Sequence, residues 1–236
     1  MQNGALRLPA ITGDFLGGGE LTGQADVDLT RPGVPFKIDL TVKGGHLGAL
    51  PKALLPADEV RGDVEGRLAL SGYAEALETL QGGGLIRCAD ITAARSPDLD
   101  VAAAGAGEEK LKELAVDSAA ALFQIAHRVV AVRDLTVKSE HAMLRALGQV
   151  AFDGRLNINA RLYLTPEALG VAQRVESRLP PEQRLGFRAL EDTDWHYRDT
   201  LVRGTAGQPA ADLRGTGELR PLRDEIQALF AAEPAG

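Results

Sequence analysis

The chain has 236 residues, enough for one large domain or two small ones, and its 44% hydrophobic and 25% charged residues are ordinary for a globular protein. Its net charge is −7 and no basic run alternates with aromatic residues, which argues against nucleic acid as a partner and against electrostatic attachment to anionic lipid. Only 4% of residues are aromatic, so the apolar surface is mostly aliphatic. The one cysteine, Cys88, cannot form an intramolecular disulfide and leaves the compartment open.

Alternation of apolar and polar residues predicts strands in the first third of the chain. Apolar side chains recur at every second position in Gly19–Thr30, Pro35–Lys43 and Val60–Leu70, so each strand has one dry and one wet face. Short helices are expected at Leu47–Leu55, which contains Pro51, and at Ala74–Leu80. The glycine clusters at 17–19 and 82–84 lack the Lys-Ser/Thr of a phosphate-binding loop, and turns or bulges are expected there.

The middle of the chain continues the strands. Strands are expected at Leu85–Thr92, Leu122–His127 and Val129–Ser139, with a loop at 103–107 and a short helix at Glu108–Val116. The residues at 103–107 are a possible boundary within a single module that covers 1–236.

A hairpin is the clearest element of the sequence. The strands Met143–Phe152 and Arg155–Leu164 flank Asp153-Gly154, a pair typical of a two-residue type I′ turn. The pattern places one aliphatic face on both strands, formed by Leu144, Ala146, Val150, Phe152, Leu156, Ile158, Ala160, Leu162 and Leu164.

The last third mixes a helix with further strands. Thr165-Pro166-Glu167 is a helix start, and the helix is expected to run to about Arg178, before Pro180-Pro181. Gln183–Asp194 is expected to be irregular and is followed by strands at Tyr197–Gly204 and Ala210–Leu219 and a helix at Pro221–Ala232. Strands that follow one another directly, with few helices, predict a mainly β fold built as an antiparallel meander.

The aliphatic strand faces must be covered, because apolar area left in water costs about 25 cal/mol per Å². Two arrangements remain open: closure of the sheet on itself, or an apolar groove that an acyl chain fills. The residues expected to line such a groove share the dry faces of the predicted strands and are Val27, Leu29, Phe36, Ile38, Leu40, Val42, Leu68, Leu70, Leu144, Val150, Phe152, Ile158 and Leu162.

The sequence offers little reactive chemistry. Asp192, Asp194 and His196 would share one face of a strand and could ligate a divalent metal, but a solvated polar edge beside Trp195 is the favoured interpretation. The histidines at 46, 127 and 141 lie at strand ends or in turns, and no serine has an evident base. We therefore expect no enzymatic activity, no catalytic residue, no metal and no cofactor.

Several segments together are similar to one known family. The run from Ser118 to Glu167, which contains DLTVKSE, LRALGQV and DGRLNINARL, resembles the C-terminal region of AsmA-like envelope proteins of the AsmA and TamB type. The glycine-punctuated segments GELTGQADVDL, GDVEGRLALSG and GGGLIRCADI upstream, and RGTAGQPAADLRGTGEL downstream, resemble strands of the same family.

The resemblance implies a curved, taco-like β-sheet with an apolar groove, in a bacterial protein anchored in the inner membrane and extending into the periplasm. It implies phospholipid as the ligand, carried toward the outer membrane, and an expected role in outer-membrane biogenesis. The alternative is a structural or interaction module for outer-membrane assembly, paired with neighbouring sheet of a longer chain or with envelope proteins. The chain shows no spanning helix and no signal peptide, so we expect a segment whose anchor lies elsewhere.

Overall fold

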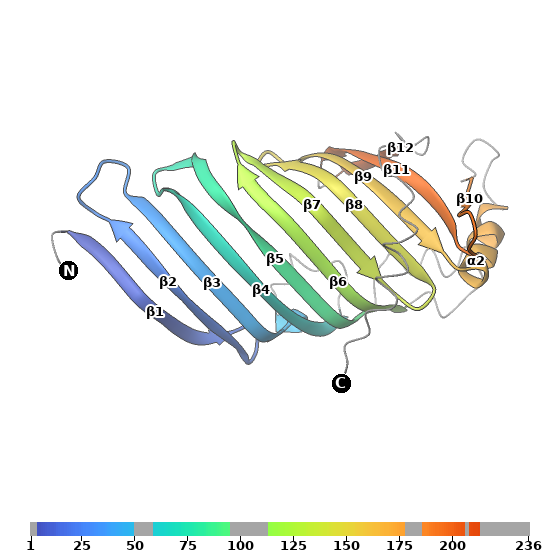
Figure 1. Cartoon of the computed structure of the whole chain (residues 1–236), viewed down its shortest axis with the longest axis horizontal. Coiled ribbons are helices and arrows are strands. Elements are labelled where there is room, and N and C mark those ends of the chain that lie inside the picture. The colour runs from blue at the N-terminus through green and yellow to red at the C-terminus, as the bar shows by residue number, and fades with distance from the viewer. Residues whose placement is uncertain (1–3, 50–58, 95–112, 178–185, 206–207, 213–236) are drawn as a thin grey trace.

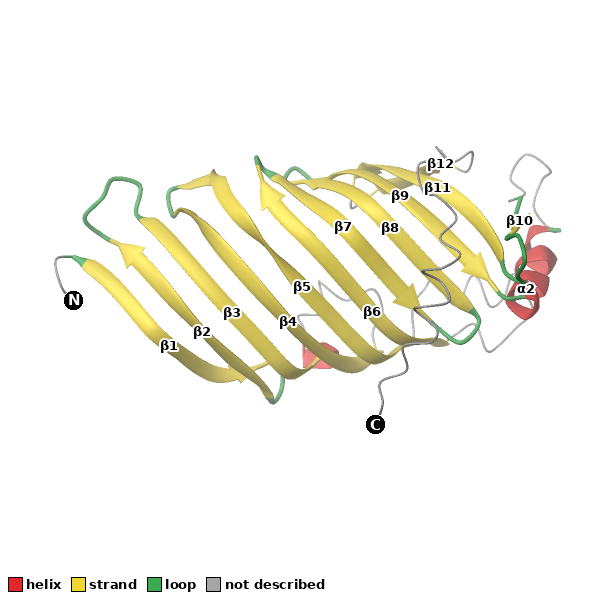
Figure 2. Ribbon diagram, in the orientation of Figure 1, coloured by secondary structure: helices red, strands yellow, loops and turns green. Residues whose placement is uncertain are grey.

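The computed structural model describes residues 4–49, 59–94, 113–177, 186–205 and 208–212, and these form one antiparallel sheet with a single α-helix (Figures 1 and 2). The 12-stranded sheet runs in the order β1-β2-β3-β4-β5-β6-β7-β8-β9-β11-β10, and β12 also pairs with β11. Because β1 lies at one end of this order and β10 and β12 at the other, the sheet is open. The predicted mainly β antiparallel meander is confirmed.

The strands are long and mostly follow one another directly. Their bounds are β1 Ala5–Phe15, β2 Gly19–Asp28, β3 Pro35–His46, β4 Glu59–Tyr73, β5 Ala76–Ala94, β6 Glu113–Ala126, β7 Val129–Lys138, β8 Ala142–Ala151, β9 Arg155–Leu164, β10 Arg188–Ala189, β11 His196–Thr205 and β12 Gln208–Asp212. Only the step from β9 to β11 is interrupted, by the helix α2 (Pro166–Glu176) and β10.

Two helices expected from the sequence are wrong. Ala74–Leu80 forms a turn followed by the start of β5, because Ala76 and Gln81 pair with Tyr73 and Ser71 of β4. The described part of Glu108–Val116 belongs to β6, where Glu113 to Val116 pair with β5. In both places a few apolar residues at helical spacing were outweighed by long-range strand pairing. Gly82–Gly84 likewise lies inside β5 and not at a turn or bulge.

The hairpin β8–β9 forms between the two expected strands, with their aliphatic residues on one face, but with a different loop. Leu144 pairs with Leu162, and Val150 pairs with Leu156. The loop has three residues, 152–154, and of Asp153 and Gly154 only Gly154 has a positive φ, 87°. The amide of Gly154 donates to the carbonyl of Ala151 at 2.8 Å. A turn followed by one left-handed glycine is the common three-residue hairpin, so the predicted type I′ turn is wrong.

The helix α2 matches the predicted start. The side-chain hydroxyl of Thr165 accepts a hydrogen bond from the amide of Ala168 at 3.4 Å, as an N-cap does, and Pro166 is the first helical residue. A 3-10 turn, η1 (Leu47–Ala49), is the described part of the helix expected at Leu47–Leu55. In the described ranges no helix has both the length and the apolarity needed to cross a membrane. The loop at 103–107, the helix at Pro221–Ala232 and most of the strand at Ala210–Leu219 lie outside the described residues.

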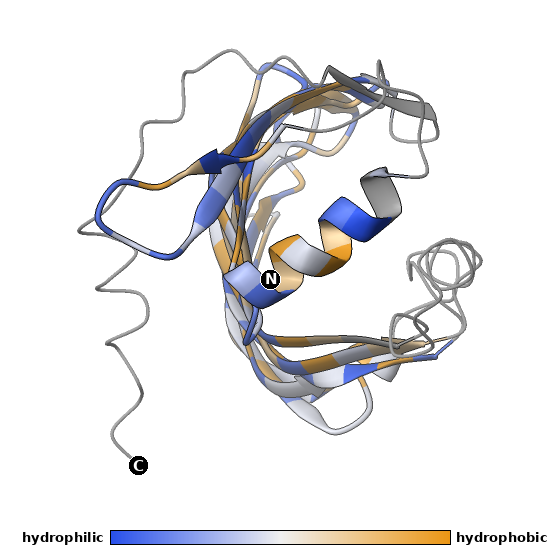
Figure 3. Ribbon diagram, turned by 90° about the vertical axis from the view of Figure 1, so that its right-hand side faces the viewer, coloured by the Kyte–Doolittle hydropathy of each residue, from blue (hydrophilic) through white to orange (hydrophobic). Residues whose placement is uncertain are grey.

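The sheet is strongly curved, and α2 identifies which of its faces is concave. Seen from the β11 end, α2 lies inside the curve, and the loop that carries β10 lies outside it (Figure 3). Leu190 of that loop packs with Met143 and Tyr163 in a buried cluster, so these two strand residues point to the convex side. Their strand neighbours Leu144, Leu162 and Leu164 alternate with them and therefore point to the concave side.

Candidate functional site

The concave side of the sheet carries four unbroken rows of apolar residues, which together form what we call the inner face. Three rows cross from β1 to β9 through directly paired residues, and in the fourth the step from β2 to β3 is a close approach, where a Cβ on Gly19 would lie 2.5 Å from Gly45 Cα. Two rows are Leu8, Ala25, Ile38, Leu70, Gly82, Ile125, Val130, Val150, Leu156 and Ile11, Gly23, Leu40, Leu68, Gly84, Phe123, Val132, Gly148, Ile158. The other two are Gly13, Leu21, Val42, Gly66, Ile86, Ala121, Leu135, Ala146, Ala160 and Phe15, Gly19, Gly45, Val64, Cys88, Ala119, Val137, Leu144, Leu162.

Most of the inner face is not sealed by the described residues. Leu8, Phe15 and Ile86 are 40%, 42% and 41% exposed. Most of the other large side chains in the four rows are half-buried, although each has apolar neighbours on the adjacent strands. At the β11 end, Leu164 and Leu169 are buried where α2 begins. Of the two arrangements left open by the sequence, closure of the sheet on itself is therefore wrong for the described residues.

Glycines on the inner face let the strands approach closely. A Cβ atom on Gly148, whose φ is 153°, would lie 2.2 Å from the carbonyl oxygen of Asn157. A Cβ on Gly84 would lie 2.9 Å from the ring of Phe123, its partner across β5 and β6. The aromatic ring covers the backbone that the glycine leaves bare, an arrangement known to stabilise glycine in strands.

The structure brings together eleven of the thirteen predicted lining residues. Nine lie within the four rows, and Val27 and Phe36 pair with each other and with Leu6 in a shorter row on the same face. Leu29 and Phe152 lie in loops just beyond the paired rows, 51% and 39% exposed. Strand alternation had been extended one position too far in each case, past the point where pairing stops.

Sequence reasoning missed much of the inner face on β6 and β7. Phe123, Ile125, Val130, Val132 and Leu135 belong to it, but apolar residues also occur on the opposite side of these strands, such as Leu122, which is 48% exposed. With both faces partly apolar, a period of two does not identify the inner side. A bulge at residues 133 and 134 shifts the alternation further. The pairing register was the missing information.

The convex side is polar over its first half. Arg67 and Asp39 form a two-pronged ion pair across β4 and β3, with Nε to Oδ1 at 3.1 Å and Nη2 to Oδ2 at 2.7 Å. The hydrogen bond from Arg67 lowers the pKa of Asp39 below its ordinary value, and the charge of Arg67 adds to this. Arg7 and Asp26 make a similar contact at 2.7 Å across β1 and β2. This face is a solvated surface.

At the β11 end the convex side carries the main buried cluster. Met143, Tyr163 and Leu190 pack with Trp195 and Tyr197, under the loop that carries β10. Arg161 is 2% exposed there and donates to Asp199 at 2.5 and 2.7 Å, and its guanidinium lies 4.5 Å from the ring centre of Tyr197. Burial lowers the pKa of Arg161, but its hydrogen bonds and ion pairing with Asp199 outweigh burial, so the pKa is raised. This cluster holds the last strands together.

The candidate metal ligands are not assembled. Asp192 and Asp194 lie in the turn before β11, whereas His196 is the first residue of that strand and pairs with Leu164 on the concave side. Within the described ranges no group of three or more His, Cys, Asp or Glu side chains is placed to hold a metal ion. The predicted sharing of one strand face by the three residues is therefore wrong.

The other histidines make simple surface contacts. His46 Nδ1 lies 2.9 Å from Asp63 Oδ1. His141 Nε2 lies 3.7 Å from Glu140 and 3.8 Å from Glu167, because residues 140 and 141 form a bend where neighbouring side chains need not point in opposite directions. Cys88 is half-buried on the inner face, and burial raises the pKa of its thiol, which keeps it protonated at neutral pH.

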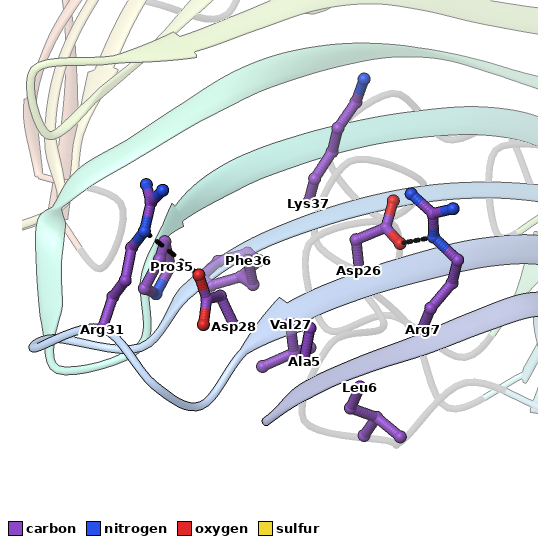
Figure 4. A pocket seen from close by; sticks show the side chains of 10 residues that line it. All are labelled: Ala5, Leu6, Arg7, Asp26, Val27, Asp28, Arg31, Pro35, Phe36 and Lys37. Carbon is purple, nitrogen blue, oxygen red and sulfur yellow. Dashed lines mark hydrogen bonds and ion pairs between the residues drawn. The ribbon is translucent and has the colours of Figure 1, made fainter. Parts of the chain in front are cut away.

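A shallow pocket at the β1 edge shows that the sheet is one layer thick there. Its lining comes from both faces: Arg7, Asp26 and Lys37 point to one side of the strands, and Leu6 and Val27 to the other (Figure 4). It is the exposed end of the sheet and offers no enclosed volume for a substrate.

Within the part of the chain that the structure describes, the functional site is thus a surface: a concave apolar face, uncovered along most of a curved sheet, with no cluster of metal-ligating side chains. Comparisons with family models, with curated proteins and with solved structures gave no match to this chain, so its function is argued from that surface.

Proposed function

We propose that this chain is a lipid-binding module whose inner face holds the acyl chains of phospholipid. The observation that carries the proposal is the set of four apolar rows that cross nine paired strands while most of their large side chains are only half-buried by the described residues. At about 4.8 Å between strands and about 6.7 Å between rows, the face measures roughly 38 by 20 Å, on the order of 760 Å². That exceeds the largest apolar patch of a typical monomeric protein, about 300–600 Å².

The chemistry of the face suits a flexible hydrocarbon. Its side chains are mainly Val, Leu, Ile and Ala, with Phe15 and Phe123 as the aromatic members of the four rows, so it offers little to a planar or polar ligand. Covering it would release about 25 cal/mol per Å² of apolar area from water. The curve of the sheet around α2 places this surface on the inside (Figure 3).

The cellular setting of the proposal is the bacterial envelope. It is supported by the strand and glycine pattern that resembles AsmA-like proteins, and by the curved sheet with an apolar concave face that such a resemblance implies. In this setting the module is periplasmic, part of a longer protein anchored in the inner membrane, and carries phospholipid toward the outer membrane. Binding of this kind needs no reactive group, in keeping with a role without catalysis.

The test is direct extraction followed by inner-face substitution. Phospholipid is expected in organic extracts of the purified protein by mass spectrometry, at a defined ratio to protein. Ile158→Asp places a carboxylate in the middle of the inner face and is expected to abolish binding of the copurified lipid. Asn157→Asp, one residue earlier on the convex side of β9, is the matched control and is expected to retain it. Absence of lipid from the unsubstituted protein, or equal lipid in both variants, would contradict the proposal.

A second role, as an interaction module, is favoured by the free edge of β1. Four inner rows reach this edge, where no described element covers them, whereas the opposite end carries α2, β10 and β12. A further strand could pair with β1 and extend both the sheet and its apolar face. The irregularity at Pro9 and Ala10 divides the edge into Ala5–Leu8 and Ile11–Phe15, so pairing would use one half at a time. Concentration-dependent sedimentation that Thr12→Pro abolishes would support this role.

A further inference from the structure

The apolar rows of the inner face end in polar residues at one corner of the sheet. On β11, His196, Arg198 and Thr200 alternate along the concave side, where they pair with Leu164, Leu162 and Ala160 of β9. Thus a row that is apolar from Phe15 to Leu162 ends at a guanidinium. The neighbouring positions toward β12, Val202 and Gly204, are apolar, so the polar group is confined to the half of β11 nearest α2.

The corner is built and half-enclosed. Arg198 donates from Nη2 to Thr200 Oγ1 at 3.3 Å, and its guanidinium lies 5.9 Å from the ring centre of Phe187. His196 Nδ1 is buried and has no hydrogen-bond partner in the described residues. A buried polar atom left unpaired is costly, so the ring nitrogen of His196, two residues from Arg198 on the same face of β11, is a candidate to bind a polar ligand group.

We propose that Arg198, His196 and Thr200 form a site for the anionic phosphate headgroup of an amphiphile whose hydrocarbon lies along the inner face. The inference rests on the proposed lipid-binding function and assigns a direction to the ligand, with its headgroup at β11 and its tails toward β1. Residues two apart on a strand are about 6.7 Å apart, so a phosphate between them could accept hydrogen bonds from Arg198 and from either neighbour. A planar guanidinium is well suited to such recognition.

The local charges are compatible with an anion. The carboxylate of Glu167, in the first turn of α2, is 76% exposed and lies near His141, and the Asp199 carboxylate is paired with Arg161 on the convex side. The N-terminus of α2 follows Leu164, the partner of His196, and adds a partial positive charge close to the corner. The helix end and Arg198 therefore favour a negative ligand, and the exposed carboxylate of Glu167 opposes it.

The test compares two fluorescent probes that share the same acyl chains: NBD-labelled phosphatidylglycerol, which is anionic, and NBD-labelled diacylglycerol, which is uncharged. Unsubstituted protein is expected to bind both, and the anionic probe more tightly. Arg198→Gln is expected to weaken the affinity for the anionic probe about tenfold to hundredfold. The affinity for the uncharged probe is expected to stay unchanged. Arg203→Gln makes the same charge change on the convex side of β11, where Arg203 is exposed, and is expected to alter neither.

Further variants separate a binding role from a structural one. Arg198→Lys keeps the charge and is expected to retain most of the preference for the anionic probe. Thr200→Glu adds a carboxylate beside Arg198 without removing it and is expected to abolish the preference, which keeps the test valid if Arg198→Gln does not fold. Inorganic phosphate alone is expected to displace the anionic probe only far above that probe's dissociation constant; displacement at equal concentration would make this a phosphate site unrelated to lipid and would overturn the inference.

The outcomes distinguish the two proposals. If both probes bind equally and Arg198→Gln changes neither, the headgroup site is refuted while lipid binding stands. If neither probe binds, lipid binding is refuted and the headgroup site with it. If only the anionic probe binds, and no inner-face variant changes its affinity, the protein binds anions without using its apolar face. That outcome contradicts both the lipid-binding proposal and the headgroup site.

Discussion

The openness of the inner face makes a specific prediction for Leu40→Asp. Leu40 lies in the middle of β3, paired with Gly23 on one side and Leu68 on the other, and it is half-buried. The carboxylate of the variant would stay hydrated on the open concave side. The expected loss is therefore confined to the contact with Leu68, about 0.2–1 kcal/mol, and the poorer strand propensity of aspartate, about 1 kcal/mol.

Together these two terms lower the free energy of unfolding of Leu40→Asp by about 1–2 kcal/mol. If a second layer sealed the face, the same substitution would remove a packed leucine side chain, about 2–5 kcal/mol, and would also bury a charge at several kcal/mol more. The chain holds a matched reference for the sealed case. Leu201 on β11 is 3% exposed, and Leu201→Asp is expected to cost at least about 4 kcal/mol or to prevent folding.

Urea unfolding followed by far-ultraviolet circular dichroism measures both variants, with the slope of the transition checked for constancy. Leu40→Asp is expected to fold and to lose bound lipid. A loss of stability as large for Leu40→Asp as for Leu201→Asp would refute the open face, and with it the reason for proposing an acyl ligand.

Three further perturbations test what holds the sheet together. Asp199→Ala leaves the buried guanidinium of Arg161 unpaired and is expected to lower the free energy of unfolding in urea by about 3–5 kcal/mol. Replacing both Arg161 and Asp199 by aliphatic residues should recover most of that loss. Equal losses in the single and the double variant would contradict this expectation. Gly148→Ala would place a Cβ 2.2 Å from a backbone oxygen of β9 at a φ of 153° and is expected to lower the unfolding temperature, with a cost of about 1–3 kcal/mol. Asp39, whose pKa Arg67 lowers, contributes stability at neutral pH that is lost as the pH falls through that lowered pKa; the loss is about 1 kcal/mol or less, and Asp39→Asn should remove this acid dependence in pH-dependent unfolding.

The sequence predicted the strands best where one face is polar. In β2, β3 and β4 the alternation of residues such as Lys37, Ile38 and Asp39 marks both the strand and its inner side. It predicted α2 equally well, because Thr165 and Pro166 specify a helix start locally. These signals are local, so they survive without knowledge of the partner strands.

The errors share one physical cause, which is dependence on long-range pairing. The turn at Ala74 and Glu75 and the strand that follows are decided by the pairing of β5 with β4, and Leu29 and Phe152 lie beyond the last paired residues of β2 and β8. The corner at Arg198 depends on register too: only the pairing with Leu162 shows that its side of β11 continues the apolar rows. No local pattern distinguishes Arg198 from Arg203, which lies on the other face.

The arrangement of the stabilising contacts explains how a sheet can keep an apolar face open. Most strands are held by backbone hydrogen bonds to both neighbours, and these do not depend on what covers the inner side. The packed cluster of Met143, Tyr163 and Leu190 lies on the convex side, so the concave side is left out of the main core. A ligand that covers the inner face would then add its burial energy to a fold that is already formed, and should raise the unfolding temperature without changing the strand content. A protein that needed the ligand to form its sheet would instead lose strand content when delipidated.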